Sequence, residues 1–264
     1  MVATRQKNMK IALYLKPELE ESDIATYLIS KISEHGLDID EDYPDIVMFV
    51  GGDGTLLRAA QAYLDDLDEI KFVGVNKGSL GFYAGYSIDE VDKLLDDLES
   101  GFYSSRKHPL IEAVVDNQKL YAVNEIRIEN PFHTLIADVY INEELFETFR
   151  GNGLVISSSI GSSAYNKSLG GAVVVPEVDT LQLTEIAPIN NRVYSSLNAS
   201  LVMPSDYRIE FSCAEADVVV GYDHQTLSTR IKNIAISSSN KTIEIIYPAN
   251  HSFIKQYGEA FLNE

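Results

Sequence analysis

The sequence predicts an α/β N-terminal domain with a parallel sheet, followed by a mostly antiparallel, all-β C-terminal domain. In the first hundred residues, short apolar stretches alternate with segments of helical spacing. This alternation is typical of parallel strands joined by right-handed helical crossovers. After Gly101 the helical spacing stops, and apolar stretches follow one another across short turns. We therefore expect domains at 1–101 and 102–264, with a C-terminal tail that could pack back on the first domain.

The elements of the N-terminal part follow from apolar spacing. Continuous apolar stretches, the kind that a sheet buries on both faces, predict strands at residues 10–15, 45–50 and 71–76. Helical spacing predicts helices at residues 18–36, 55–67 and 87–101. The last helix is expected to begin at a Ser87 cap and to end at Gly101.

The elements of the C-terminal part are strands joined by short turns. Strand-like segments cover residues 110–130, 135–151, 207–231 and 233–248. Residue types that favour tight turns interrupt them at Asp116-Asn117, Asn142-Glu143 and Ser239-Asn240. A ligand site is expected in the cleft between the two domains, where such sites commonly lie.

Composition excludes several classes of protein. The 264 residues carry a net charge of -19, which argues against a nucleic-acid or membrane binder. The single cysteine, Cys213, permits no intrachain disulfide, and no histidines have metal-ligand spacing. We therefore expect no metal site built by the protein alone. No apolar stretch has the length of a signal peptide or membrane span, so we expect a cytoplasmic protein.

The turn at residues 51–55, Gly-Gly-Asp-Gly-Thr, is the first stretch that suggests chemistry. It follows the apolar strand 45–50 and opens a helix, and ligands of α/β sheets bind at such strand ends. Helix-start N–H groups favour phosphate, and Asp53 could accept a proton from a hydroxyl nucleophile or bind Mg²⁺. Alternatively, Asp53 only caps the helix. The turn matches neither a Walker A loop nor a Rossmann fingerprint.

Two further stretches suggest a nucleotide ligand. Residues 73–85 end a strand in four glycines, with Phe82 and Tyr83 offering flat faces for a ring, although such aromatics often belong to the core. Asn124 could hydrogen-bond a base edge, and Glu125 could accept bonds from two ribose hydroxyls. Alternatively, the Asn-Glu pair is a solvated turn between strands.

Polar residues also gather at two later positions. The serine-rich stretch 153–174 contains Tyr165; its hydroxyl and N–H groups suit phosphates, and the ring could stack on a base. The alternative is a flexible loop. Asp223 and His224 follow another strand, and His titrates near neutral pH; the alternative there is a plain hairpin turn.

Together these motifs resemble the NAD kinase family. The family shows, in order, Gly-Gly-Asp-Gly-Thr, Gly-x-Leu-Gly-Phe, an Asn-Glu pair, and a Ser/Thr-rich loop that ends in Ala-Tyr before Gly-Gly. The matching residues are 51–55, 78–82, 124–125, 162–165 and 170–171. The first motif alone also occurs in close form in phosphofructokinases and in diacylglycerol and sphingosine kinases, but the combination is specific.

The resemblance implies transfer of the γ-phosphoryl group of ATP to the adenosine 2′-hydroxyl of NAD⁺, which gives NADP⁺. It implies Mg²⁺ or another divalent metal with ATP, an N-terminal nucleotide-binding domain, a C-terminal NAD-binding domain, and a homodimer or homotetramer. The implied catalytic residue is Asp53. The implied phosphate-loop residues are Gly51, Gly52 and Thr55.

The resemblance also implies the residues that bind NAD. Asn124 and Tyr165 would hold adenine in a pocket lined by Ser163 and Ala164, and Glu125 would hold a ribose. The other implied residues are Ala187 and Ile189 on the nicotinamide side, Asp223 and His224 near the acceptor ribose, and Gly54, Phe82, Asn152 and Ser168.

Three departures from the family pattern leave the affinity and the phosphoryl donor open, whether ATP, another triphosphate or polyphosphate. Ser157–Ser159 replaces Ser-Thr-Pro, Ile160 cannot hydrogen-bond adenine, and Asn152 replaces an aspartate. The alternative functions are a non-catalytic NAD-binding sensor and a lipid kinase. The presence of Asp53, Asn124 and Glu125 together argues against the sensor, and the acidic charge without a basic amphipathic helix argues against the lipid kinase.

Overall fold

The computed structural model describes residues 8–20, 22–78, 81–115 and 117–262. The chain divides into two compact units, one formed by Met1–Lys107 with Ile243–Glu264 and the other by His108–Thr242. We describe each unit by itself. Among the described residues, no helix is long and apolar enough to cross a membrane.

The first unit is built on a parallel sheet, as the sequence predicts. Its strands run in the order β2-β1-β3-β4-β15, and every neighbouring pair is parallel. The short β5 also pairs in parallel with the end of β4. The strands are β1 (Lys10–Leu15), β2 (Asp38–Ile39), β3 (Ile46–Val50), β4 (Lys71–Asn76), β5 (Tyr86–Ser87) and the last residues of β15 (Gln225–Pro248).

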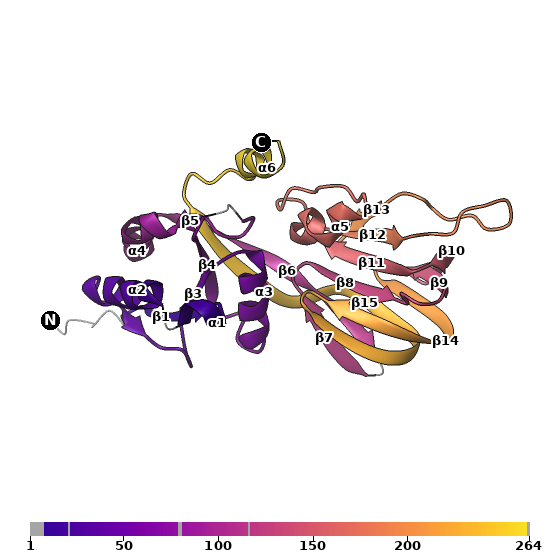
Figure 1. Cartoon of the computed structure of the whole chain (residues 1–264), viewed down its shortest axis with the longest axis horizontal. Coiled ribbons are helices and arrows are strands. Elements are labelled where there is room, and N and C mark those ends of the chain that lie inside the picture. Colours follow the sequence, from indigo (N-terminus) through magenta and orange to yellow (C-terminus); the bar gives the residue numbers. More distant parts are fainter. Residues whose placement is uncertain (1–7, 21, 79–80, 116, 263–264) are drawn as a thin grey trace. The chain divides into compact units, whose positions relative to one another are not determined.

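Helices cover both faces of this sheet (Figure 1). On one face, α2 (Asp23–Glu34) and α4 (Val91–Ser100) bury Leu28 and Leu94 against Met48 and Val73 of the sheet. On the other face lies α3 (Asp53–Ala62), which starts two residues earlier than predicted and ends five residues earlier. The remaining helices of the unit are α1 (Pro17–Glu20), the 3-10 helix η1 (Ile88–Glu90) and α6 (Phe253–Phe261).

The helix ends follow local chemistry. The predicted helix 18–36 is two helices, α1 and α2. Ser87 caps η1 in a capping box with Glu90, and α4 continues from there. Gly101 ends α4 in the left-handed conformation, with φ 72°, which glycine adopts without steric cost.

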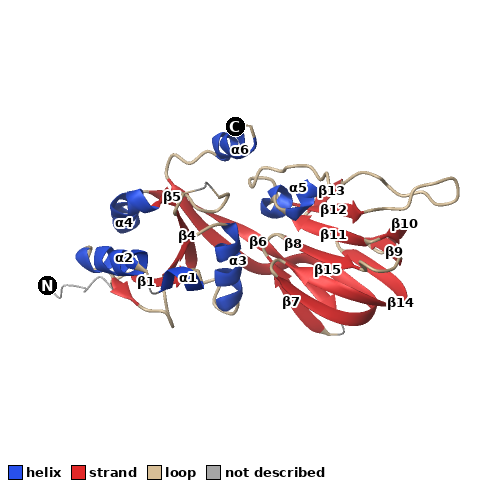
Figure 2. Ribbon diagram, in the orientation of Figure 1, coloured by secondary structure: helices blue, strands red, loops and turns tan. Residues whose placement is uncertain are grey.

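The regular elements of the second unit are mostly strands, and its described helices are the short η2 (Ile160–Ser163) and α5 (Tyr165–Ser168) (Figure 2). The strand pairings whose direction is described are all antiparallel here, which confirms the predicted change of architecture. The strands are β6 (Tyr103–Val115), β7 (Gln118–Ala122), β8 (Glu125–Glu129), β9 (Leu135–Ile141), β10 (Glu144–Gly151), β11 (Gly153–Ser158), β12 (Thr180–Ile186), β13 (Leu201–Pro204), β14 (Ile209–Tyr222) and most of β15.

Strand β14 pairs with two different strands of this unit, β9 and β8. Its first residues pair with β9 and its last residues with β8, with an irregularity between Ser212 and Ala216. The core of the unit lies between the strands and includes Phe149, Leu154, Phe211 and other fully buried side chains.

The predicted turns have different outcomes. Asn142 and Glu143 form a hairpin turn with φ 48° and 70°, as predicted. The prediction of a turn at Ser239-Asn240 is wrong, because β15 continues through both residues. Serine and asparagine favour turns locally, but the buried Ile236 and Ile243 on either side hold the segment in the sheet. Asp116 of the remaining turn lies outside the described residues.

Candidate active site

The glycine-rich turn of the first unit connects β3 to α3. Gly51 has φ 142°, and a Cβ atom there would lie 2.5 Å from Thr55 Oγ1, so the turn requires glycine. Gly52 is the N-cap of α3, and Asp53 is the first helical residue. The interpretation of Asp53 as a plain N-cap is therefore wrong. Gly54 is exposed, whereas Thr55 is fully buried.

The carboxylate of Asp53 joins the two glycine-rich motifs. Its Oδ1 atom accepts hydrogen bonds from the backbone N–H groups of Phe82, at 2.9 Å, and Tyr83, at 3.1 Å. A Cβ atom on Gly81 would lie 2.6 Å from the same oxygen, so only glycine permits this approach. Burial raises the pKa of Asp53, although the hydrogen bonds from Tyr83 and Phe82 lower it. Ser79 and Leu80 of the second motif lie outside the described residues.

Helix α6, which is not predicted from the sequence, supports the loop that contains Gly81 and Phe82. The buried Gln256 donates a hydrogen bond from Nε2 to the carbonyl oxygen of Gly81, at 2.7 Å. The Phe82 ring contacts the rings of Tyr257 and Phe261, with centroids 5.4 and 5.1 Å away. The C-terminal helix therefore fixes the loop that holds Asp53.

In the second unit, Asp223 anchors the Asn124-Glu125 pair. Its carboxylate accepts hydrogen bonds from the N–H groups of Val123, at 2.8 Å, and Asn124, at 2.7 Å. Asp223 has φ 49° in the two-residue turn between β14 and β15, and His224 beside it is exposed. Burial raises the pKa of Asp223 to about 6, although the backbone hydrogen bonds lower it. Residues 223–224 thus form a hairpin turn, but Asp223 is buried and holds the backbone of Val123 and Asn124.

Glu125 lies at the start of a row of polar side chains on β8. Its nearest cation is Arg127, whose Nη1 atom is 3.8 Å from Glu125 Oε1, while Arg127 Nε is 2.8 Å from Glu129 Oε2. The guanidinium also lies 5.6 Å from the centre of the Tyr165 ring. Burial, and next the charge of Asp223, raise the pKa of Glu125 to about 7. Arg127 and Glu129 are not among the residues predicted from the sequence, although alternate strand residues share a face.

The serine-rich stretch is packed against this pair. Ser158 Oγ donates to the carbonyl oxygen of Val123, at 2.7 Å, and accepts from Gly161 N–H, at 3.0 Å. A Cβ atom on Gly161 would overlap the Asn124 carbonyl, so glycine is required. The flexible-loop alternative is therefore wrong. Of the predicted residues here, the half-buried ones are Ser163, Ala164 and Tyr165, and the exposed one is Ser168.

Asn152, Ala187 and Ile189 form a separate group of the second unit. The N–H of Asn152 donates to the Ile186 carbonyl, its side-chain amide donates to Asn130 at 3.1 Å, and Ile189 N–H donates to Arg150 at 2.7 Å. Ala187 and Ile189 are exposed. The described contacts do not join this group to Glu125 or Tyr165.

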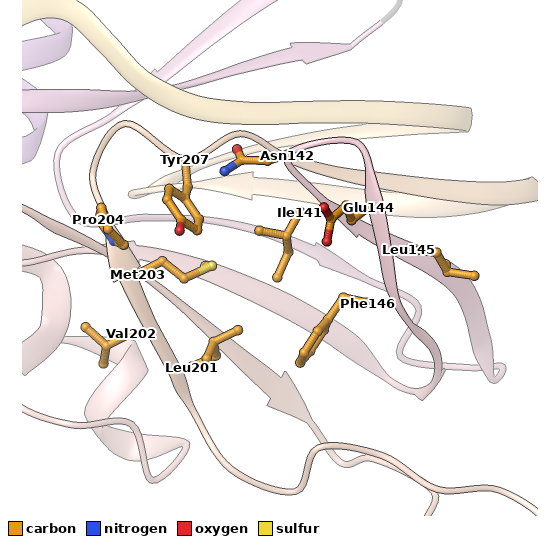
Figure 3. Close-up of a pocket in the computed structure, with 10 residues that line it drawn as sticks. All are labelled: Ile141, Asn142, Glu144, Leu145, Phe146, Leu201, Val202, Met203, Pro204 and Tyr207. Carbon is orange, nitrogen blue, oxygen red and sulfur yellow. The ribbon is translucent and has the colours of Figure 1, made fainter.

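A cavity of about 490 Å³ lies elsewhere on the second unit and contains none of the predicted site residues. Figure 3 shows its apolar lining, which includes Leu145 and Phe146 of β10 and Met203 of β13. Each of these strands has only one described pairing partner, β9 for β10 and β12 for β13. The cavity therefore lies beside two sheet edges.

Sequence comparison identifies the family. The model of the ATP-NAD kinase N-terminal domain matches residues 1–103, and that of the C-terminal domain matches residues 123–247. The NAD kinase of Leuconostoc mesenteroides subsp. mesenteroides is 36% identical, and the alignment covers 97% of this chain and 99% of that protein. For the NAD kinase of Latilactobacillus sakei subsp. sakei, identity is 38% and coverage is 96% and 98%.

Solved structures share the fold. A yeast NADH kinase complexed with NADH superposes with a TM-score of 0.84 at 18% identity, covering 98% of this chain and 90% of that chain. An NAD kinase from Archaeoglobus fulgidus in complex with ATP gives a TM-score of 0.78 at 20% identity, with coverage of 94% and 96%. The sensor and lipid-kinase alternatives are not favoured by these relatives. The chain belongs to the ATP-NAD kinase family, whose members are phosphotransferases acting on a hydroxyl of NAD.

Proposed function

We propose that this chain transfers the γ-phosphoryl group of ATP to the adenosine 2′-hydroxyl of NAD⁺ and forms NADP⁺, with Asp53 as the catalytic residue. The observation that carries the proposal is the geometry of Asp53. Its Oδ1 atom is held by two backbone N–H groups, while Oδ2 has no hydrogen-bond partner among the described residues. One oxygen is thus fixed and the other is left for a reacting hydroxyl.

The chemistry needs little from the protein beyond a proton acceptor and positioning. A ribose hydroxyl is a weak nucleophile at neutral pH, and a carboxylate within reach can take its proton as the new P–O bond forms. Because burial raises the pKa of Asp53, this carboxylate is a stronger base than an exposed aspartate. Phosphates would meet the N–H groups at the start of α3 and the open turn at Gly51 and Gly52.

We propose Mg²⁺ or another divalent metal as the companion of ATP. Mg²⁺ in nucleotide sites is held mainly by phosphates and water, so the phosphates of ATP would supply most of its ligands. When bound, the metal would neutralise charge on the transferring phosphoryl group. The protein itself would position the acceptor hydroxyl and accept its proton.

The proposed NAD contacts lie in the second unit, in the first turn of α3 and at Phe82 of the first unit. Glu125 suits a ribose because its Oε2 atom is buried without a described hydrogen-bond partner, and Tyr165 offers a face for adenine. Asp223 acts through the backbone of Asn124, so we propose that it positions this pair. The remaining proposed contacts are Gly54, Phe82, Asn152, Ser163, Ala164, Ser168, Ala187, Ile189 and His224.

The test is NADP⁺ formation by the purified protein from NAD⁺, ATP and Mg²⁺, compared with Asp53→Asn. Asparagine keeps the shape but cannot accept a proton, so kcat should fall about 100- to 10,000-fold. The affinity for NAD⁺, measured by calorimetry, should change little. Asp65→Asn, at an exposed position after α3, is the matched control. Wild-type turnover by Asp53→Asn would remove Asp53 from the mechanism.

We further propose a cytoplasmic homodimer or homotetramer. The support is the exposed apolar surface at the edges of β10 and β13, where Leu145 is 58% exposed and Val202 43% exposed. Light scattering should show a mass of two or four chains. Leu145→Glu should lower that mass if this surface is the interface.

A further inference from the structure

Lys16 lies beside the glycine turn, at the carboxyl end of β1. Strands β1 and β3 are parallel neighbours, with Leu15 opposite Val50. Lys16 follows Leu15 and Gly51 follows Val50, so the two residues leave the sheet at the same edge. A Cβ atom on Gly51 would lie 3.3 Å from Lys16 Cε. The lysine side chain therefore passes over the open face of Gly51.

Lys16 differs from most lysines of the first unit in its charge environment, and among the described residues it shares this difference with Lys77. The chain has 40 acidic residues against 21 lysines and arginines, and Lys10, Lys31, Lys71 and Lys93 each form an ion pair. Lys16 is exposed and makes no ion pair or side-chain hydrogen bond with the described residues. A positive charge is thus left available at the ligand-binding edge of the sheet.

Thr55 gives an independent indication of a ligand at the same place. It is fully buried, and its Oγ1 atom has no hydrogen-bond partner among the described residues. This oxygen would lie 2.5 Å from a Cβ atom on Gly51, so it faces the same position as the Lys16 side chain. The N-terminus of the ten-residue helix α3 begins two residues after Gly51. A cation, a hydroxyl and helix N–H groups therefore surround the Gly51 face.

We propose that Lys16 binds the phosphate chain of the phosphoryl donor over Gly51. The proposal rests on the proposed kinase function and assigns a donor-binding residue that the sequence motifs do not include. A lysine ammonium is a compact point charge with three donors, which suits phosphate oxygens. Since Lys16 would contact phosphates and not a base, the ligand class is a linear triphosphate or polyphosphate, whatever group it carries.

The kinetic test compares Lys16→Met and Lys16→Arg with wild type. Loss of a charged hydrogen-bond donor should raise the KM for ATP about 10- to 100-fold. The KM for NAD⁺ should stay unchanged, and Lys16→Arg should recover most of the loss because the charge remains. GTP should show the same dependence on Lys16 as ATP. Lys232→Met removes an exposed lysine of β15 in the other unit and should leave all constants unchanged.

A binding test separates this proposal from the kinase function. Calorimetry with sodium tripolyphosphate needs no NAD⁺ and no turnover, and binding should weaken by the same factor in Lys16→Met. If wild type makes no NADP⁺ but binds tripolyphosphate through Lys16, the kinase function fails and the Lys16 site stands. Wild-type constants in Lys16→Met, or no tripolyphosphate binding by wild type, overturn the proposal. Circular dichroism checks the fold, and Lys16→Gln replaces Lys16→Met if that variant unfolds.

Discussion

Glu125 combines a proposed ligand-binding position with a cost to the folded protein. It is only 5% exposed, and its one cationic neighbour among the described residues, Arg127, is shared with Glu129. Burial and the nearby Asp223 charge raise its pKa from 4.5 to about 7. The folded state therefore binds a proton at Glu125 more tightly than the unfolded state does. Stability from this group is complete below about pH 4.5 and is lost as the pH rises through 7.

Glu125→Gln should remove this pH dependence. The amide keeps the size of the carboxyl group and cannot ionise, so the variant should be more stable than wild type at pH 8, by up to about 3 kcal/mol. The two proteins should converge near pH 4.5, and thermal unfolding across this range measures the difference. Glu177→Gln, at an exposed position of the same unit, should follow wild type throughout. Parallel curves for Glu125→Gln and wild type would contradict the prediction.

At single positions, the sequence predicts residues within motifs better than the residues that support them. Asp53 stands out because an acid among glycines is unusual. Arg127 could have been found from the alternation of strand side chains, since it shares a face with Glu125. Gln256 could not, because its contact with Gly81 joins residues 175 positions apart. Only the folded chain brings such a pair together.

At the scale of elements, the serine-rich stretch and β8 form one packed arrangement. Ser158 bonds both Val123 and Gly161, and the missing side chain of Gly161 lets the stretch lie directly on Asn124. The obstacle to a larger residue is backbone, which cannot rotate away as a side chain can. The position of the predicted adenine residues therefore depends on one glycine.

Gly161→Ala should lower the free energy of unfolding by about 2–4 kcal/mol, because the added methyl group overlaps a buried carbonyl. Urea unfolding followed by circular dichroism measures this change. Gly258→Ala is the matched control, since a Cβ atom there meets nothing within 4 Å in the interior of α6. It should stabilise the protein by about 0.5–1 kcal/mol. Equal stabilities for the two variants would show that the close approach at Gly161 is unimportant.

The elements differ in how well the sequence predicts them. Strands β1, β3 and β4 are continuous apolar stretches, and the helical segment formed by η1 and α4 has a clear cap and end, so local pattern suffices. Helix α6 is not predicted, because a nine-residue helix gives only a short periodic pattern. Its contacts with Phe82 also join residues that lie far apart in the sequence. The predicted turn at Ser239-Asn240 is wrong, because local turn preference takes no account of the buried isoleucines on either side.

At the scale of the whole molecule, the chain leaves the first unit at Lys107 and returns to it at Ile243. The core of the second unit draws every buried member from residues 108–242. The core of the first unit includes Ile246, and β15 pairs with β4 through residues 244–246. The core of the second unit is therefore formed by one continuous segment, whereas the core of the first unit also needs residues after Ile243.

A fragment of residues 108–242 should fold alone, because its core is complete, and should unfold in one cooperative thermal transition. A fragment of residues 1–107 lacks the end of β15 and all of α6, so it should show no such transition. Calorimetry of both fragments, with the full chain as reference, tests the difference. A cooperative transition in the fragment 1–107 would show that the returning segment is dispensable.

The return of the chain at Ile243 also affects events on the ribosome. Domains generally fold as units, N-terminal first, while the chain is still being made. Here the first unit stays incomplete until its last strand residues, 243–248, have emerged, and these are made after every residue of the second unit. The unit that is second in the sequence is the first to have all of its residues available. The residues around Asp53 receive their support from α6 only after the second unit has been made in full.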